Sequence, residues 1–506
     1  MAPNPLRFPS LVTNNKSLPW CGRPLQSIAS GRRPFAGPGG CSRLWYAKRA
    51  NLTGAVTTVD VAKTMQARTI TDAGRALQGT VPGLTITTTS GDIGTNPTIR
   101  LRGLTGSTNA VNGAQPLILL DNVEIQSLLM VNPDDIESIS VLKDAASTSI
   151  YGSRAAFGVV LITSKSGKKN TQNKITYSNN FSRSKPTTLP TPADDDGLEY
   201  SLAATIRTNP AAKFSSAIGM RFDSASIEKI RQWKRDWGGK NLGPEMVMGR
   251  DFEVKDGAVY YYRPWDVNEL FIRDWTPQQN HNLNFAGGND KTAYSLSLGY
   301  LGQEGLMKVQ TDKFQRTNVN LNVTSSVQPW LDLRSRVMLT RTNQETPFSF
   351  ASVQYDPLYY LYRWNALYPY GTYEGKPFRN VVSEMQAAQM STVKANYGRF
   401  ALGGTIKIAP GLTVDADYTY TNNQAHVREV GGPLTAWNNW GGAPLKYETY
   451  TPPTITPSIL RGGTKTIPSK PLLPTRKSWA TTPSRSWAVW TRKHRRTLLI
   501  IPKEIT

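Results

Sequence analysis

The sequence reads Ala73-Gly-Arg-Ala-Leu-Gln-Gly-Thr-Val-Pro-Gly-Leu84, and then, in order, Ile99-Arg-Leu-Arg-Gly103, Pro116-Leu-Ile-Leu-Leu-Asp-Asn-Val123, Asn132-Pro-Asp-Asp-Ile-Glu-Ser-Ile139, Val141-Leu-Lys-Asp-Ala145 and Tyr151-Gly-Ser-Arg-Ala-Ala-Phe-Gly158. Gly, Pro and Asp separate short apolar runs, as they do between short strands. Leu117–Leu120 and Val159–Thr163 are predicted strands, and residues 144–150 predict a short helix that Gly152 stops. The mixture predicts a small α+β domain over residues 48–170.

These motifs, in this order and at this spacing, resemble the plug domain of TonB-dependent outer-membrane transporters, and within them the SusC/RagA family. The resemblance implies a plug inside a large β-barrel. It also marks seven plug residues of interest, which are Arg100, Arg102, Gly103, Asp121, Tyr151, Gly152 and Arg154. The family implies that Arg100 and Arg102 contact the inner barrel wall; two solvated arginines on a strand are the alternative. For Arg154 we expect pairing with barrel carboxylates within a plug turn, rather than an anion-binding turn.

Residues 171–450 change to strict alternation of apolar and polar residues. Val319, Leu321 and Val323 alternate with asparagines, and the 292–301 and 412–420 stretches alternate in the same way. A membrane barrel needs an apolar outer face and a polar lumen, although a soluble β-sandwich alternates similarly, and the plug resemblance favours the barrel. Only about eight strands are recognisable here, against about 22 in transporters of this type. The predicted fold is an α+β plug domain followed by an antiparallel, incomplete transmembrane β-barrel.

The basic charge of the chain is concentrated in its two flanks. The overall net charge is +23, but residues 1–50 hold eight Lys/Arg and no Asp/Glu, and residues 451–506 hold eleven Lys/Arg and one Glu. We therefore expect no nucleic-acid partner, and a basic nucleic-acid-binding protein remains an alternative. Residues 1–47 and 451–506 lack periodicity and are expected to be disordered.

Both flanks fit an off-frame reading, in which the chain is a fragment of a longer SusC-type protein. Back-translation of Trp479–Thr506 in a neighbouring frame permits a sequence similar to another barrel strand of the family. No secretory signal is visible after Met1. The family nevertheless implies the cell outer membrane as the location.

No enzyme chemistry, cofactor or metal is expected from the residue pattern. The histidines His281, His426 and His494 lack zinc spacing, and no Ser-His-Asp set, phosphate loop or CxxC motif occurs. Asp194-Asp-Asp196 is expected to be a solvated loop rather than a cation site. Within the aromatic cluster 355–373, Tyr359, Tyr360 and Trp364 are candidates for sugar stacking, although an aromatic girdle or a packed loop is the favoured interpretation.

The resemblance implies a TonB-dependent importer of glycans or peptides, in which the plug gates the barrel. The partners that it implies are the TonB complex and a SusD-like surface lipoprotein. An outer-membrane binding or structural protein without transport is the second alternative that the sequence leaves open.

Overall fold

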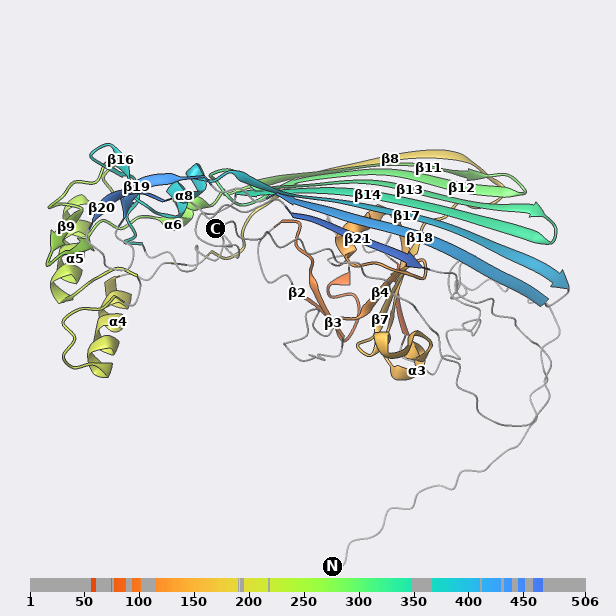
Figure 1. Cartoon of the computed structure of the whole chain (residues 1–506), viewed down its shortest axis with the longest axis horizontal. Helices are drawn as coiled ribbons and strands as arrows, with labels where there is room; N and C mark the ends of the chain where they lie inside the picture. The colour runs from red at the N-terminus through yellow and green to blue at the C-terminus, as the bar shows by residue number, and fades with distance from the viewer. Residues whose placement is uncertain are drawn as a thin grey trace, which may run out of the picture. The chain divides into compact units, whose positions relative to one another are not determined.

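The computed structural model describes residues 56–60, 74, 77–87, 93–101, 115–189, 191, 195–216, 219–347, 366–409, 412–428, 432–438, 445–450 and 458–466. These residues form a small mixed domain, a long antiparallel sheet, and a group of helices and short strands (Figure 1). None of the helices within these ranges combines the length and the apolar character needed to cross a membrane.

The mixed domain is built on a five-stranded sheet of order β1-β6-β7-β4-β5. Its strands are β1 (Val56–Asp60), β4 (Leu117–Leu120), β5 (Val123–Glu124), β6 (Ile136–Leu142) and β7 (Val159–Ser164). β4 and β7 run parallel and the other pairs are antiparallel. A separate hairpin joins β2 (Leu84–Thr87) to β3 (Thr98–Leu101). This architecture confirms the predicted α+β domain.

Short helical turns connect the strands of this domain. They are η3 (Leu128–Met130), η4 (Pro133–Asp135), α3 (Ala145–Thr148) and η5 (Ser149–Ala155). Each of the first three begins at a capping side chain, for example Asp144, which accepts a bond from Ser147 N at 2.9 Å. The predicted strands over 117–120 and 159–163 and the helix before Gly152 are present.

The core of this domain continues into the long sheet. Ile139, Val141 and Val160 have 0% of their surface exposed, and Met338 and Tyr397 of the long sheet belong to the same apolar cluster. The mixed domain is therefore packed against one face of the sheet.

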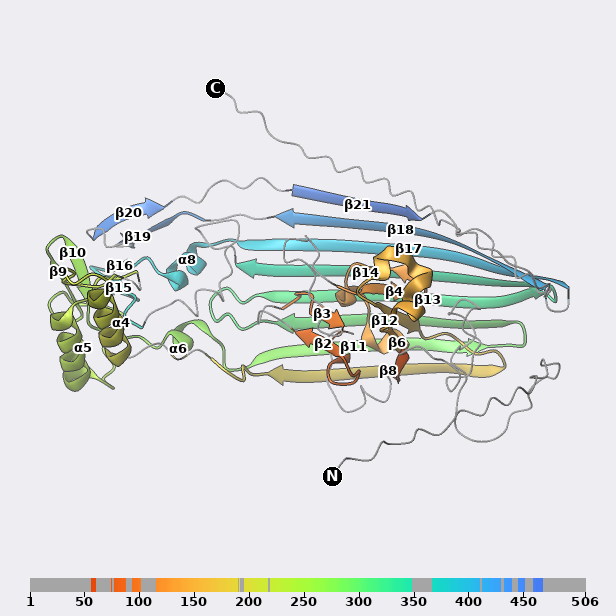
Figure 2. The same ribbon diagram turned by 90° about the horizontal axis from the view of Figure 1, so that it is seen from below.

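The long sheet has eight antiparallel strands in the order β21-β18-β17-β14-β13-β12-β11-β8 (Figure 2). They are β8 (Thr171–Ser184), β11 (Thr276–Gly288), β12 (Thr292–Glu304), β13 (Lys313–Gln328), β14 (Leu331–Pro347), β17 (Met390–Ala409), β18 (Leu412–Arg428) and β21 (Ser458–Thr466). The three alternating stretches of the sequence analysis lie in β12, β13 and β18. The sheet is open, with β8 and β21 at its edges, so the described strands form an incomplete barrel.

Strand β21 lies in the flank for which no regular structure was predicted. It pairs with β18 from Thr419↔Thr466 to Val427↔Ser458. Ladder bonds use only backbone N–H and C=O groups, so a strand can form where the side chains do not alternate. The strand was not predicted because its residues do not alternate: Ile459 is followed by Leu460, and Gly462 by Gly463.

A third set of elements comes from three connections of the long sheet, and we call it the loop domain (described residues of 195–271, 366–388 and 432–450). Its elements are α4 (Asp195–Thr208), α5 (Ser224–Trp237), β9 (Phe252–Lys255), β10 (Ala258–Tyr261), α6 (Val267–Phe271), β15 (Thr372–Tyr373), β16 (Lys376–Pro377), α8 (Val381–Ala387), β19 (Leu434–Asn438) and β20 (Lys446–Tyr450). All three connections contribute to one apolar cluster, for example through Trp233, Phe378 and Trp437.

The helices of the loop domain were not predicted, and the expected loop at Asp194–Asp196 was wrong for its described residues. Asp195 and Asp196 form the first turn of α4, where the helix dipole favours carboxylates. Asp195 also accepts bonds from Arg231 at 2.9 Å and Lys234 at 2.6 Å, both on α5. Asp195 and Asp196 therefore belong to a helix start that pairs with α5, not to a loop.

Candidate plug–sheet interface

The face of the long sheet toward the mixed domain is largely polar and buried. Its side chains alternate with apolar ones that point to the opposite face, as the period of two predicts. Those less than 10% exposed include Asn282, Ser295, Ser297, Arg316, Asn318, Asn322, Thr340 and Arg399. The expected division of these strands into a polar and an apolar face is confirmed.

Six bonds across this interface run from sheet side chains to backbone carbonyls of the mixed domain. The donors and acceptors are Arg316 to Leu129 (2.9 Å), Asn318 and Thr340 to Met130 (2.9 Å each), Asn322 to Lys165 (2.7 Å), Gln344 to Ile93 (2.9 Å) and Arg399 to Leu120 (2.8 Å). Buried carbonyls need partners, and the sheet supplies them. Side-chain pairs such as Asn132 with Asn282 add to this set.

One buried ion pair joins the two parts. Asp121, at the end of β4, accepts from Arg399 Nη2 on β17 at 3.2 Å, and the two side chains are 3% and 2% exposed. The same carboxylate accepts from Ser164 N at 3.0 Å and from Ser164 Oγ at 2.9 Å. These bonds satisfy the carboxylate that desolvation would otherwise penalise, so the pair is a specific attachment point.

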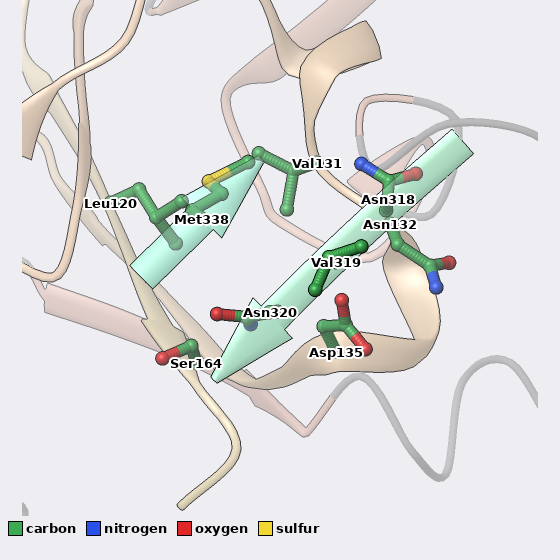
Figure 3. Close-up of a pocket in the computed structure, with 9 residues that line it drawn as sticks. All are labelled: Leu120, Val131, Asn132, Asp135, Ser164, Asn318, Val319, Asn320 and Met338. Atoms are coloured by element: carbon green, nitrogen blue, oxygen red, sulfur yellow. The ribbon is translucent and has the colours of Figure 1, made fainter. Parts of the chain in front are cut away.

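A small cavity of about 10 Å³ lies in the same interface, enough room for about one water molecule. Figure 3 shows Asn318, Val319 and Asn320 on one strand, with Asp135 and Ser164 below them. Burial raises the pKa of Asp135 to about 6, although a hydrogen bond with Ser297 acts in the opposite direction. The interface is therefore closely packed, and burial in it disfavours the ionised form of Asp135.

The sequence-predicted plug residues occupy different environments. Asp121 reaches the interface, whereas Arg100 lies exposed on β3, opposite Thr85. Tyr151 is half-buried in η5. Arg102 and Gly103 lie outside the described residues, as do the aromatic candidates Tyr359, Tyr360 and Trp364.

Local geometry explains the glycine at position 152 and the partner of Arg154. Gly152 has φ 63° and ψ −153°, a region that residues with a Cβ essentially never adopt. The turn that it makes brings Arg154 to Glu124 on β5. The expected pairing of Arg154 with a barrel carboxylate is therefore wrong: its partner belongs to the same domain, because β5 runs close to this turn.

The polar face of β13 was predicted from the sequence, but the individual donors that hold the interface were not. Arg316, Asn318 and Asn322 sit at alternate positions of β13, and Arg399 interrupts an otherwise apolar and small segment of β17. A polar residue at every second position of a long strand is the signal that could have found them.

Other chemistry has little support in the described part of the chain. There, no group of three or more His, Cys, Asp or Glu side chains is arranged to hold a metal ion. His281 instead contacts Tyr177, whose hydroxyl lies 2.8 Å from its Nδ1.

Comparison with known proteins identifies the mixed domain. Residues 48–159 match the family described as the TonB-dependent Receptor Plug Domain. TonB-dependent receptor P39 of Formosa agariphila is 27% identical over 299 residues, which cover 59% of this chain and 24% of that protein. TonB-dependent receptor SusC of Bacteroides thetaiotaomicron is 28% identical over 292 residues, covering 55% of this chain and 23% of that protein. The chain thus matches about a quarter of the length of these relatives.

The fold is also similar to that of a solved transporter. The structure of the RagAB peptide transporter superposes with a TM-score of 0.53 and 22% identity, over 77% of this chain and 42% of that one. The chain thus carries a plug domain of the TonB-dependent receptors, and over this domain and the open antiparallel sheet it is similar to SusC/RagA-type transporters.

Proposed function

We propose that the chain is part of a TonB-dependent importer in the cell outer membrane, in which the plug blocks the barrel until it is pulled aside. The observation that carries this proposal is the chemistry of the plug–sheet interface. Single hydrogen bonds to backbone carbonyls and one ion pair hold the plug. Bonds of this kind are worth about 1 kcal/mol each in net terms, and they can break and reform without loss of either fold.

The membrane location is supported by the opposite face of the long sheet. Large apolar side chains there are exposed, for example Ile175, Tyr177 and Phe181 on β8 and Phe400 and Leu402 on β17. An exposed apolar face of this extent is unfavourable in water and favourable in lipid. The strands are also long: β17 has 20 residues, whereas about 9–11 suffice to cross a bilayer.

The proposed cargo is a glycan or a peptide, and the proposed partners are the TonB complex and a SusD-like lipoprotein. The known relatives support these proposals only through the plug and the adjoining strands. The RagAB structure belongs to a peptide transporter, so peptides are the first cargo to examine.

The experiment is a reversible lock between plug and sheet. Asn423 of β18 donates to Gln126 of the plug at 2.9 Å, and both groups are accessible. We would change both to cysteine in a chain whose Cys21 and Cys41 are serine, and join them with a short, reducible thiol cross-linker. Uptake of labelled peptides and oligosaccharides by cells should stop on cross-linking, return on reduction, and disappear without TonB.

The single variants Gln126→Cys and Asn423→Cys, treated with the same reagent, are the matched controls. Uptake that is unchanged by cross-linking, or by the loss of TonB, would contradict the proposal. A second candidate is an outer-membrane protein that binds cargo without transport, since the exposed apolar face of the sheet calls for lipid but not for plug movement. It predicts cargo binding that persists in the cross-linked state, with no TonB-dependent uptake.

A further inference from the structure

The loop domain contains an open hollow of about 530 Å³ that the plug–sheet interface does not involve. It lies where α4 ends, next to the segment that leads to α5; the two helices lie side by side (Figure 2). The residues that matter for its chemistry are Thr205, Asn209, Lys213, Phe214, Ser216 and Arg221. None of the described residues that line it is a carboxylate.

Two cations at the hollow have no counter-ion among the residues that the structure describes. Lys213 and Arg221 form no hydrogen bond or ion pair with any residue that the structure describes, and Arg221 Nε is buried without an acceptor. The neighbouring cations of α5 behave differently, since Arg231 and Lys234 both bind Asp195. An unpaired pair of cations beside a hollow leaves room for an anion to supply the missing acceptors.

The Arg221 guanidinium is held in place before any ligand arrives. Its central carbon lies 3.5 Å from the ring centroid of Phe214 and 5.8 Å from that of Tyr260. Stacking on aromatic faces leaves the edge of a guanidinium free to donate hydrogen bonds. A cation fixed in this way loses little conformational entropy on binding.

The backbone around the stack is also fixed. Ser215 and Phe222 exchange two backbone bonds of 2.8 and 3.0 Å, so the residues beside them, Phe214 and Arg221, are held as neighbours. Thr205 Oγ1 on α4 donates to Ser215 Oγ at 2.9 Å, which joins this bridge to the helix. The hollow is therefore a built feature of the α4–α5 connection.

One local effect opposes an anion: the C-terminal end of α4 carries a partial negative charge. Its size is about half an elementary charge, whereas Lys213 and Arg221 together contribute two full positive charges. The carbonyls of Ala204 and Thr205 in the last turn are moreover already occupied by the Thr208 hydroxyl. The balance favours an anion.

We propose that this hollow is an oxyanion-binding site that takes a carboxylate or sulfate group. Arg221 and Lys213 supply the charge, and the Ser216 hydroxyl and the Asn209 amide supply further donors at its wall. The same group can be free in solution or carried by an acidic glycan or an acidic peptide. The site does not depend on the proposed transport function, because binding requires neither plug movement nor TonB.

The test is equilibrium dialysis of the full purified chain in detergent against sodium sulfate, trigalacturonate and triglutamate, with maltotriose and trialanine amide as uncharged probes. We expect saturable binding of the oxyanions and none of the uncharged probes. The double variant Lys213→Gln/Arg221→Gln should bind them at least about ten-fold more weakly, since it loses two charge-assisted contacts. The carrier that binds most tightly identifies the source of the anion.

The matched control for each single change is Arg207→Gln, which removes one positive charge from the exposed last turn of α4, at a residue that does not line the hollow. It should leave affinity within about two-fold, because an exposed charge is strongly screened. If circular dichroism shows that the double variant misfolds, the single variants Arg221→Lys and Lys213→Gln take its place in the binding measurement. Absence of oxyanion binding, or an equal loss in Arg207→Gln, would overturn the proposal.

Discussion

Arg399 of β17 and Asp121 of the plug form a buried ion pair although 278 residues separate them in the sequence. Arg399 donates to Asp121 Oδ2 at 3.2 Å and to the carbonyl of the preceding Leu120 at 2.8 Å. One guanidinium therefore recognises both the end of a plug strand and the carboxylate that follows it.

Arg399→Met should weaken the seating of the plug by about 3–5 kcal/mol, because it leaves the Asp121 carboxylate buried without its cation. The double variant Arg399→Met/Asp121→Asn should lose less seating free energy than the sum of the losses in the two single variants. Hydrogen exchange of the β4 amides in the purified chain measures the change. Lys407→Met, which breaks the exposed pair with Asp332 at 2.8 Å, is the control and should cost less than about 1 kcal/mol. Similar losses at both sites would contradict a special role for the buried pair.

The seating of the plug should strengthen as pH falls from about 6 to about 4. Burial raises the pKa of Asp135 from 3.8 to about 6, so the folded interface binds a proton more tightly than the unfolded chain does. The stabilising contribution is full below the unfolded pKa and is lost as pH rises through the folded pKa.

Hydrogen exchange at residues 132–136, compared between wild type and Asp135→Asn at each pH, measures this effect. The variant lacks the buried Asp135 carboxyl, so its protection should not show the decline between pH 4 and 6. A wild-type chain whose protection is unchanged or rises over that interval would show that Asp135 does not control the seating.

Asp251→Ala should destabilise the loop domain by about 2–4 kcal/mol. The carboxylate is 0% exposed and accepts from Trp233 Nε1 at 2.8 Å, from Val247 N at 2.8 Å and from Arg250 Nη2 at 2.7 Å. Burial alone would raise the pKa of Asp251, but these bonds outweigh it and hold the pKa below its ordinary value. Removal of the carboxylate leaves three donors without their acceptor.

Limited proteolysis within residues 219–271 measures the opening of the loop domain. Glu253→Gln is the matched control, because Glu253 forms a more exposed pair with Lys229. Its effect should stay below about 1 kcal/mol. Equal susceptibility of the two variants would show that Asp251 is not a central contact.

Gly158→Ala should destabilise the plug more than Gly152→Ala. Both glycines have positive φ, 93° and 63°, so each substitution strains the backbone by about 1–3 kcal/mol. A Cβ at Gly158 would in addition lie 2.3 Å from Leu101 Cδ1 and 3.0 Å from Leu142 O, whereas the space at Gly152 is open. The added overlap should cost about another 1–3 kcal/mol, as measured by thermal unfolding of the purified chain. The reverse order would refute this account of the two turns.

Local patterns were sufficient to predict plug strands such as β4 and β7, and the two faces of the long sheet. Alternation depends only on the backbone period, so Val319 and Asn318 could be placed on opposite faces from the sequence alone. Helix α5 of the loop domain carried signals as well. Ile227, Ile230 and Trp233 recur at intervals of three, and Asp223 with Ser226 forms a capping box. They were missed because the alternation on either side suggested strands throughout.

Partners distant in the sequence could not be predicted in this way. The motif around Asp121 marks a plug strand but does not show that Arg399 will meet it, and Arg154 has a local partner that no spacing rule indicates. Such pairings are set by how the plug docks on the sheet, which depends on the summed packing of both parts rather than on any one stretch.

The donors of the long sheet bind mostly backbone carbonyls of the plug. Their bonds therefore depend on the course of the plug backbone more than on the identity of the plug side chains. Leu129, Met130 and Lys165 offer the same acceptor whatever side chain they carry. Many plug substitutions should therefore be tolerated at these positions so long as the turns keep their course. Surface side chains of the plug can therefore vary without loss of these bonds. An insertion or deletion in the plug backbone would instead displace the carbonyls from their donors.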